Sequence, residues 1–469
     1  MEHTKIKKKR FEMPHVYIIL MSMMLLVIIM SFIVPSGEYV RTVDPVTENT
    51  IVDPDSYHTV EKPTPTSPLG FGVAIYNGAM NAASIFFQII MVCGTLEFLQ
   101  TTGAFEAGVG KLVNTFSNHI SLLPAVILLI FTILGNIGMQ DGCLPLYPIA
   151  AGIMIRAGYD KVSAVGAGIL GEAIGFSGGA LNMFTVGISQ EILGIPIFSG
   201  FSFRLMASTL FYIVTVSYLL WYCKRIRKDP TKSVIADEYI NQLSTQKESE
   251  SLPLTWQRSV ALIGLLIAVI LQGYGPLKLG WGIAEITSLY VILTFVIVII
   301  FKINPNKACE IYMEGAKNIL PAAFVLAFSN AILVLMNNAK IIDTAIHTLV
   351  QALEGKEEIG ILIILFFAIM AFEFLVSSGT GKAMLIMPIL KPIGQIINMS
   401  RQLIVVVYQY AEGATQYIWP TSGTLLAALG LCKVRYQDWV KFAWKPILLI
   451  TLTNIVMVIL AYKLQIGPF

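Results

Sequence analysis

Apolar stretches long enough to cross a lipid bilayer recur along this chain from one end to the other. A transmembrane helix needs about 20 consecutive, mostly apolar residues to cover the hydrocarbon core. Clear examples lie at residues 13–34, 84–99, 122–137, 203–223, 260–274, 283–301, 359–375 and 446–462. Little sequence remains between them for a large soluble domain. We therefore predict an all-α polytopic membrane protein.

The composition agrees with a chain that lives in lipid. Hydrophobic residues make up 55% of the sequence and charged residues only 13%, whereas soluble domains carry about 25% charged residues. The five cysteines are dispersed, without a CxxC pair or the spacing of a metal site. We interpret them as buried apolar side chains and predict neither a disulfide framework nor a metal site.

Lys and Arg mark the cytoplasmic loops of membrane proteins. Residues 1–12 are strongly basic, residues 35–69 are mainly acidic, and residues 224–254 begin with a basic cluster. We therefore place the N-terminus and the central loop (224–254) in the cytoplasm and the first loop (35–69) outside. The apolar run after the basic tail has full span length, so we predict an uncleaved first helix at 13–34 rather than a signal peptide.

The chain divides into two similar halves. A helical hairpin at 255–303 follows the central loop, and by the charge rule the segment 70–223 starts outside whereas 304–469 starts inside. Pro148 and Pro388 lie 240 positions apart, and at the same offset Glu172 falls on Glu412. We predict two repeats of inverted topology.

Each half contains two polar, glycine-bearing interruptions of its apolar pattern. They lie at 135–142 and 177–182 in the first half, and at 377–382 and 419–424 in the second. Broken helices at membrane depth are tolerated where they line a protein interior or a wet cavity. Such breaks in corresponding places of two inverted halves indicate a solute site near the midplane, exposed alternately as one bundle moves against another.

The residues at these breaks suit a small polar solute. Small residues let the backbone approach a ligand, hydroxyls and amides form directional hydrogen bonds, and broken helix ends offer free N–H and C=O groups. For any one Gly or Ser, the alternative is close packing between helices. The predicted solute-binding residues are Gln140, Asp141, Gly142, Asn182, Thr185, Ser377, Ser378, Gly379, Thr380, Thr421 and Ser422.

Acidic residues within spans are costly and therefore functional candidates. Glu172 and Glu412 rank first because they recur at the repeat offset, and Glu373 precedes a break in the second half. We predict that these carboxylates bind the charge of the solute or a coupling proton; the alternative is a structural, hydrogen-bonded carboxyl. Lys382 either balances one of them or snorkels to an interface. We expect Arg204 to be an interfacial anchor.

Several segments resemble a known family. Residues 180–200, with Asn182 and Thr185, resemble the Asn-Pro-Phe-Thr-Val-Gly signature of YfcC-type carriers, and residues 34–38, 377–383 and 420–423 match as well. These carriers belong with the C4-dicarboxylate anaerobic carriers of the ion transporter superfamily. The chain departs from the pattern at Met183, which replaces the signature proline, at 140–142 and at 417–419.

The resemblance implies a more detailed fold. Each inverted repeat would contain a re-entrant hairpin and a broken helix, with hairpin tips near 140–142 and 377–381. A scaffold domain would form a homodimer, and a transport domain would move as an elevator. Family members include dicarboxylate carriers and basic amino-acid antiporters of the arginine/ornithine kind, so the resemblance leaves the solute open.

Charge complementarity favours a cationic or zwitterionic solute. The predicted core holds four carboxylates, those of Asp141, Glu172, Glu373 and Glu412, but a single cation, Lys382. Arg is the usual partner of carboxylate ligands, and none falls in either break. We expect exchange of a basic amino acid across the cytoplasmic membrane. The alternative is a C4-dicarboxylate carrier, with H⁺ or Na⁺ as the coupling ion.

Other classes of protein fit less well. Channels repeat around a pore, whereas inverted halves suit alternating access, so a channel is a remote alternative. The five His residues are dispersed without Cys or Asp at ligand spacing, and we predict no catalytic residues, enzyme activity or cofactor. The expected partners are a small solute, the bilayer and, by resemblance, a second copy of the chain, but no nucleic acid.

Overall fold

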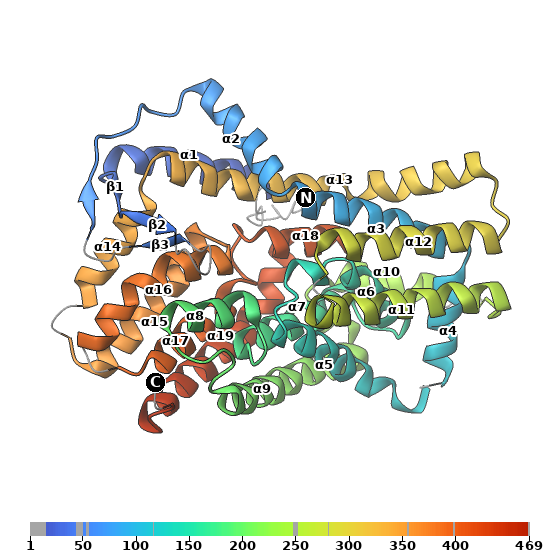
Figure 1. The fold of residues 1–469 in the computed structure, drawn as a ribbon. Helices are drawn as coiled ribbons and strands as arrows, with labels where there is room; N and C mark the ends of the chain where they lie inside the picture. Colours follow the sequence, from blue (N-terminus) through green and yellow to red (C-terminus); the bar gives the residue numbers. More distant parts are fainter. Residues whose placement is uncertain are drawn as a thin grey trace, which may run out of the picture.

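The computed structural model describes residues 16–43, 50–52, 56–115, 117–246, 252–279, 281–353, 356–396 and 399–467. The predicted basic tail, residues 1–12, and the first residues of the predicted first helix lie outside these ranges. Within them the chain is almost wholly helical (Figure 1). The first ten helices are α1 (Val16–Ile33), α2 (Pro68–Asn81), α3 (Ala83–Thr101), α4 (Ala104–Thr115), α5 (Leu123–Asn136), α6 (Leu146–Arg156), α7 (Lys161–Gly178), α8 (Ile188–Leu193), α9 (Phe201–Lys228) and α10 (Ala236–Gln246).

The second part of the chain begins with the predicted hairpin. Its helices are α11 (Trp256–Lys278), α12 (Ile283–Ile300), α13 (Pro305–Asn338), α14 (Ile342–Leu353), α15 (Glu358–Leu375), α16 (Gly379–Ile396), α17 (Arg401–Thr415), α18 (Gly423–Leu431) and α19 (Tyr436–Lys463). Short helical turns are η1 (Ser117–Leu122), η2 (Asp141–Cys143), η3 (Met183–Gly187) and η4 (Pro230–Lys232).

Several helices are long and apolar enough to cross a membrane. Five qualify among the described residues, namely α3, α9, α12, α15 and α19, and a pair bent by 76° between α13 and α14 would make a sixth. Large apolar side chains such as Phe295 and Val456 remain exposed on their outer faces. Exposure on this scale suits contact with lipid rather than water, as expected of a multi-pass membrane protein.

The first loop holds the few short strands of the described, mostly helical structure. Strand β1 (Gly37–Glu38) pairs antiparallel with β4 (His58–Thr59), and β2 (Arg41–Val43) pairs antiparallel with β3 (Thr50–Val52). Thr42 lies opposite Ile51 in the second pair. The physical reason is local, because β-branched residues are concentrated in β2 and β3 and favour extended backbone.

The helices form two packed groups. The long helix α13 runs beside α1, α2 and α3, and α3 also packs on α12 (Figure 1). A small separate core, which includes Leu96, Tyr290 and Leu293, joins α3, α11 and α12. The other group packs α5, α7, α9, α17 and α19 on one another. Movement of one group against the other stays a prediction.

Helix boundaries recur at the offset found in the sequence. α6 ends at Arg156 and α16 at Ile396, which are 240 positions apart. Asp160 and Ser400, also 240 apart, are the N-caps of α7 and α17, and each side chain accepts from the backbone N–H three residues on, at 2.8 and 3.2 Å. Such caps satisfy donors that a helix start leaves free. The inverted orientation of the halves stays a prediction.

Candidate functional site

Two broken helices, α7 and α17, pack against each other within the group of α5, α7, α9, α17 and α19. α7 ends at Gly178, and its C-cap, Gly179, has a φ of 54°, a left-handed conformation that favours glycine. α17 packs on α7 there, and the Gln409 side-chain amide donates to the Phe176 carbonyl. A Cβ at Gly413 would overlap Ser177. The close approach of the two helices therefore requires glycine at position 413.

Polar groups at the breaks are buried without partners. The Asn182 carboxamide oxygen accepts from the N–H groups of Phe184 and Thr185, at 3.0 and 3.2 Å. The Asn182 amide nitrogen and the hydroxyls of Thr185 and Thr421 are buried and have no hydrogen-bond partner. Ser422 caps α18 by accepting from the N–H three residues on. Unpaired buried groups are costly, and a role of these atoms in solute binding stays a prediction.

The first predicted hairpin tip contacts the second half. Gln140, Asp141 and Gly142 lie half-buried between α5 and α6. The Thr424 hydroxyl, in α18, donates to the Asp141 carboxylate. The Gly142 carbonyl accepts from Gln272 of α11. The predicted tip is thus linked to a helix break in the second half of the chain and to the helical hairpin that follows the central segment.

The second predicted tip contacts the first half in the equivalent way. The Thr380 hydroxyl donates to the Phe184 carbonyl of η3 at 3.0 Å, and positions 184 and 424 are 240 apart. Ser378 accepts from the Gly381 N–H at 3.2 Å. Ser377 is half-buried beside it. Each predicted tip therefore touches the helix break of the other half of the chain.

A buried lysine lies between two buried carboxylates beside the second tip. Lys382, Glu373 and Glu412 are all fully buried, from α16, α15 and α17 respectively. The Lys382 ammonium contacts Glu373 and lies 3.2 Å from Glu412 Oε2. A Cβ at Gly379 would overlap the Glu412 carboxylate. Of the two roles left open for Lys382, the structure selects charge balance.

Glu172 occupies the equivalent place in the first half, among different neighbours. It is fully buried in α7, and the Tyr147 hydroxyl donates to it. Tyr417 also lies close to it. No ion pair of the described residues includes Glu172, and one of its oxygens has no partner. An ionised carboxylate is costly in such a place.

Arg204 is the buried group that sequence reasoning misplaced. We expected an interfacial anchor, but the side chain is fully buried in the first turn of α9. It donates one bond to the Ser199 carbonyl, while Nε and Nη1 have no partner. Tyr410 lies beside it. The sequence did hold a signal, because a cation in the first turn of a helix interacts unfavourably with the helix dipole. Such a placement indicates that other contacts hold the side chain.

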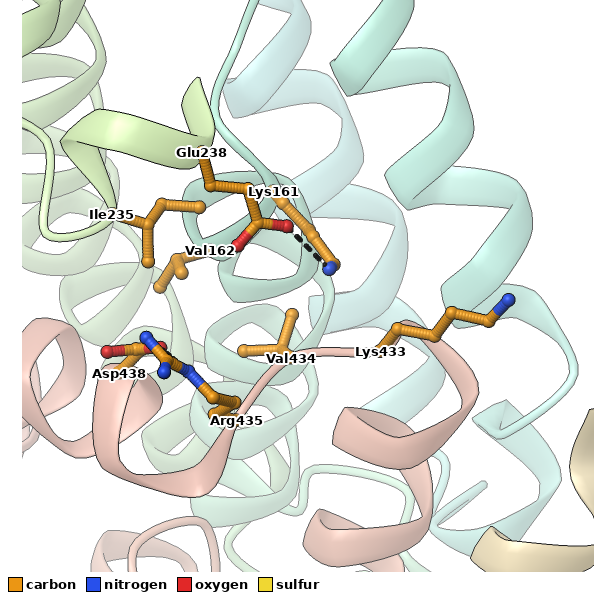
Figure 2. A pocket seen from close by; sticks show the side chains of 8 residues that line it. All are labelled: Lys161, Val162, Ile235, Glu238, Lys433, Val434, Arg435 and Asp438. Carbon is orange, nitrogen blue, oxygen red and sulfur yellow. Dashed lines mark hydrogen bonds and ion pairs between the residues drawn. The ribbon is translucent and has the colours of Figure 1, made fainter. Parts of the chain in front are cut away.

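A cavity of about 390 Å³ lies elsewhere, where the central segment meets the turn between α18 and α19 (Figure 2). Lys161 pairs with Glu238 at 2.9 Å, and Arg435 pairs with Asp438 at 2.7 Å. Lys161 lies 11 residues before Glu172 on α7, or about 16 Å along the helix. The cavity is thus separate from the breaks, and its acidic side chains already have cationic partners.

The central segment, predicted as a polar loop at 224–254, contains the helix α10 among its described residues. α10 docks on the turn between α6 and α7, where the Tyr239 hydroxyl donates to the Gly158 carbonyl at 2.7 Å and Gln242 donates to the Tyr159 carbonyl at 2.8 Å. Burial raises the pKa of Tyr239 to about 12, so this donor keeps its proton at physiological pH. Among the described residues, no three His, Cys, Asp or Glu side chains gather as metal ligands would.

Comparison with solved structures gives only weak overlap. The Alcanivorax borkumensis YdaH transporter covers 97% of this chain and all of its own length, at 14% identity and a TM-score of 0.42. Neisseria gonorrhoeae MtrF, from a class of antimetabolite efflux pumps, covers 95% of this chain and 94% of its own, at 13% identity and a TM-score of 0.41. Similarity at this level carries no conclusion about fold or function.

Comparison of sequences is more informative. An Escherichia coli (strain K12) protein named "Putative basic amino acid antiporter YfcC" is 28% identical over 92% of this chain and 93% of its own length. An uncharacterized Haemophilus influenzae protein is 23% identical over 98% of both chains. The model of the C4-dicarboxylate anaerobic carrier family, DcuC, matches residues 13–463. This match confirms the resemblance found in the motifs, and the chain belongs to the C4-dicarboxylate anaerobic carrier family of transporters.

Proposed function

We propose that this chain is a secondary transporter that exchanges basic amino acids of the arginine/ornithine kind across the cytoplasmic membrane. The observation that carries the proposal is the position of Glu412. Its carboxylate is buried beside Gly379 at the second tip, close to Thr185 of η3. Its cationic partner, Lys382, is shared with Glu373. Glu412 is therefore the acidic group best placed to receive a cationic solute.

The charge around the breaks supports a cation rather than an anion. Two carboxylates share one ammonium group beside Gly379, which leaves an excess of negative charge at the second tip. Asp141 adds a third carboxylate at the first tip. The unpaired amide of Asn182 and the unpaired hydroxyl of Thr421 offer donors for the α-carboxylate of an amino acid. The antiporter named in the Escherichia coli relative is consistent with this solute class.

The proposed mechanism is alternating access around this site. The two repeats are taken as inverted, with the hairpins and breaks in a transport domain that moves as an elevator against the α13 group, within a homodimer. The basic N-terminus is placed in the cytoplasm. Support comes from the recurrence of Asp160 and Ser400 as caps and from the reciprocal contacts of the two tips.

A proton is the coupling ion that fits the first half best. Glu172 is buried and receives a hydrogen bond from the Tyr147 phenol, with no cation paired to it in the described part of the chain. The phenols of Tyr147 and Tyr417 and the carboxyl of Glu172 form a site that a proton can occupy without an added metal ion. We assign Glu172 to proton coupling and Glu412 to the solute.

A C4-dicarboxylate carrier is the second candidate. It is favoured by the description of the family and by the two unpaired nitrogens of Arg204. Arg204 nevertheless lies on the side of α17 where Tyr410 packs on Phe211 of α9. Residues two positions apart on a helix point about 200° from each other, so Glu412 faces the opposite way. Arg204 is thus poorly placed to complete a site with Glu412.

Counterflow in proteoliposomes distinguishes the two candidates. Vesicles preloaded with unlabelled solute receive labelled arginine, labelled ornithine or labelled succinate, each against its own unlabelled form. We expect accumulation of the two amino acids and none of succinate. Accumulation of succinate alone would reject the basic amino-acid proposal and favour the second candidate, with the membrane carboxylates serving coupling or structure.

A further inference from the structure

The two acidic partners of Lys382 differ in what else they contact. Among the described residues, Lys382 is the one ion-pair partner of Glu373, at the end of α15, and also of Glu412. Glu412 faces Gly379, and Gly379 also lies against the Thr185 methyl group. Lys382 can therefore release Glu412 to a solute and still keep Glu373 as its counter-ion. A bound solute cation would then leave no buried charge unpaired.

The charge count of this cluster is one positive charge short. With all groups ionised, two carboxylates and one ammonium leave one negative charge in excess. One solute with a net charge of +1, such as arginine or ornithine, brings the sum of these three groups to zero. Asp141 is not part of this sum because its carboxylate lies at the first tip, where it accepts from the Thr424 hydroxyl. An uncompensated buried charge is strongly unfavourable. We therefore expect the proposed transport domain to move between the two sides more easily when the cluster is loaded than when it is empty.

We propose that Lys382, through its pairing with Glu373 and Glu412, makes this carrier an exchanger selective for singly charged cationic solutes. The carrier changes sides with one such solute bound and is held back when it is empty. This inference rests on the proposed function, because it takes Glu412 as the solute-binding carboxylate. It adds the reason for exchange rather than net uptake.

Glu373→Gln changes the net charge of the cluster but leaves Glu412, the proposed solute-binding carboxylate, in place. The variant removes one carboxylate, so the empty cluster becomes neutral and the cluster loaded with arginine carries an excess positive charge. We expect the ratio of arginine exchange to net arginine flux into solute-free vesicles to fall at least tenfold. Citrulline, an uncharged analogue of arginine, should be excluded by the wild type and gain transport in the variant.

Lys382→Met combined with Glu373→Gln restores the original count. The double variant loses one positive and one negative charge, so its empty cluster again has one excess negative charge. We expect it to regain arginine exchange and to exclude citrulline. Lys391→Met is the matched control, because Lys391 lies on the same helix and donates to the Ile192 carbonyl at 3.0 Å without a described ion pair. It should behave like the wild type.

The wild-type protein gives one decisive result by itself. If it exchanges citrulline as fast as arginine, the charge count does not control transport and the inference is wrong. The inference also fails if Glu373→Gln keeps the wild-type ratio, or if the double variant matches the single one. Failure of the wild type to move any basic amino acid would instead reject the proposed function itself. Thermal unfolding of each purified variant checks that its fold is intact.

Discussion

Glu172 and Glu412 are equivalent in position and different in chemistry. They lie 240 residues apart, on α7 and α17, and both are fully buried. Glu172 receives a phenol hydrogen bond from Tyr147, whereas Glu412 lies 3.2 Å from the ammonium group of Lys382. The backbone plan is repeated, but the charge environment is not.

The difference arises from two positions that are charged in one half only. At the repeat offset, Lys382 corresponds to Gly142 and Glu373 corresponds to Ile133. The first half therefore lacks the ion pair that surrounds Glu412. A duplicated scaffold can thus supply two buried carboxylates with separate roles, one proposed for protons and one for a cationic solute.

The largest effect on stability is expected from Lys382→Met alone. It leaves two buried carboxylates without their cation, which typically costs about 3–5 kcal/mol. We expect a marked fall in the thermal midpoint of the purified protein, with Lys391→Met unchanged. An unchanged midpoint for Lys382→Met would show that the cluster does not hold these charges together.

The next largest effect is expected from removing phenol donors, and the loss of stability should differ between the two halves. Tyr147→Phe deprives buried Glu172 of its donor, at a cost of about 1–3 kcal/mol. Tyr408→Phe, in the second half, loses the bond to the Gly379 carbonyl and a phenol beside Glu412. Because Lys382 still balances Glu412, we expect a smaller loss of about 0.5–1.5 kcal/mol. Midpoints in denaturant would rank the two variants, and a larger loss for Tyr408→Phe would contradict the comparison.

Contacts between tips and breaks should affect solute affinity more modestly. Asp141→Asn and Thr424→Val weaken the contact between the first tip and α18, and we expect each to raise the half-saturation concentration for arginine a few-fold. The control is Thr453→Val, because the Thr453 hydroxyl bonds only within its own helix. Unchanged half-saturation in both variants would exclude the first tip from solute binding.

The smallest effect is expected from Arg204→Met. Among the described residues, Arg204 donates to the Ser199 carbonyl, while its Nε and Nη1 have no partner. Replacing a poorly paired buried charge by an apolar side chain is often neutral or stabilising. We expect a free energy of unfolding within about 1 kcal/mol of the wild-type value, and normal arginine exchange. Loss of transport with the fold intact would instead favour the dicarboxylate candidate.

The sequence predicted the parts of the fold that depend on local pattern. Span-length apolar runs and the glycine-bearing interruptions follow from residues close together in the chain. The offset that joins Glu172 to Glu412 follows from comparing the two halves of the sequence. The helix ends at Arg156 and Ile396 agree with that offset. The strands β2 and β3 escaped notice because three-residue runs are too short to show periodicity.

The partners within the site could not be predicted in the same way. Lys382 was left between two roles because its contacts, at positions 373 and 412, are fixed by helix packing rather than by spacing. Tyr147 contacts Glu172 from another helix, and nothing local distinguishes it from an interfacial tyrosine. Arg204 was misplaced for the same reason, since its burial depends on how other helices pack against α9.

The most direct test compares Glu412→Gln with Glu172→Gln in one arginine counterflow experiment at several pH values. We expect Glu412→Gln to abolish accumulation of labelled arginine at every pH. Glu172→Gln should retain exchange but lose its response to a pH gradient. Wild-type accumulation by Glu412→Gln, in a protein with an unchanged thermal midpoint, would contradict the assignment of Glu412 to the solute.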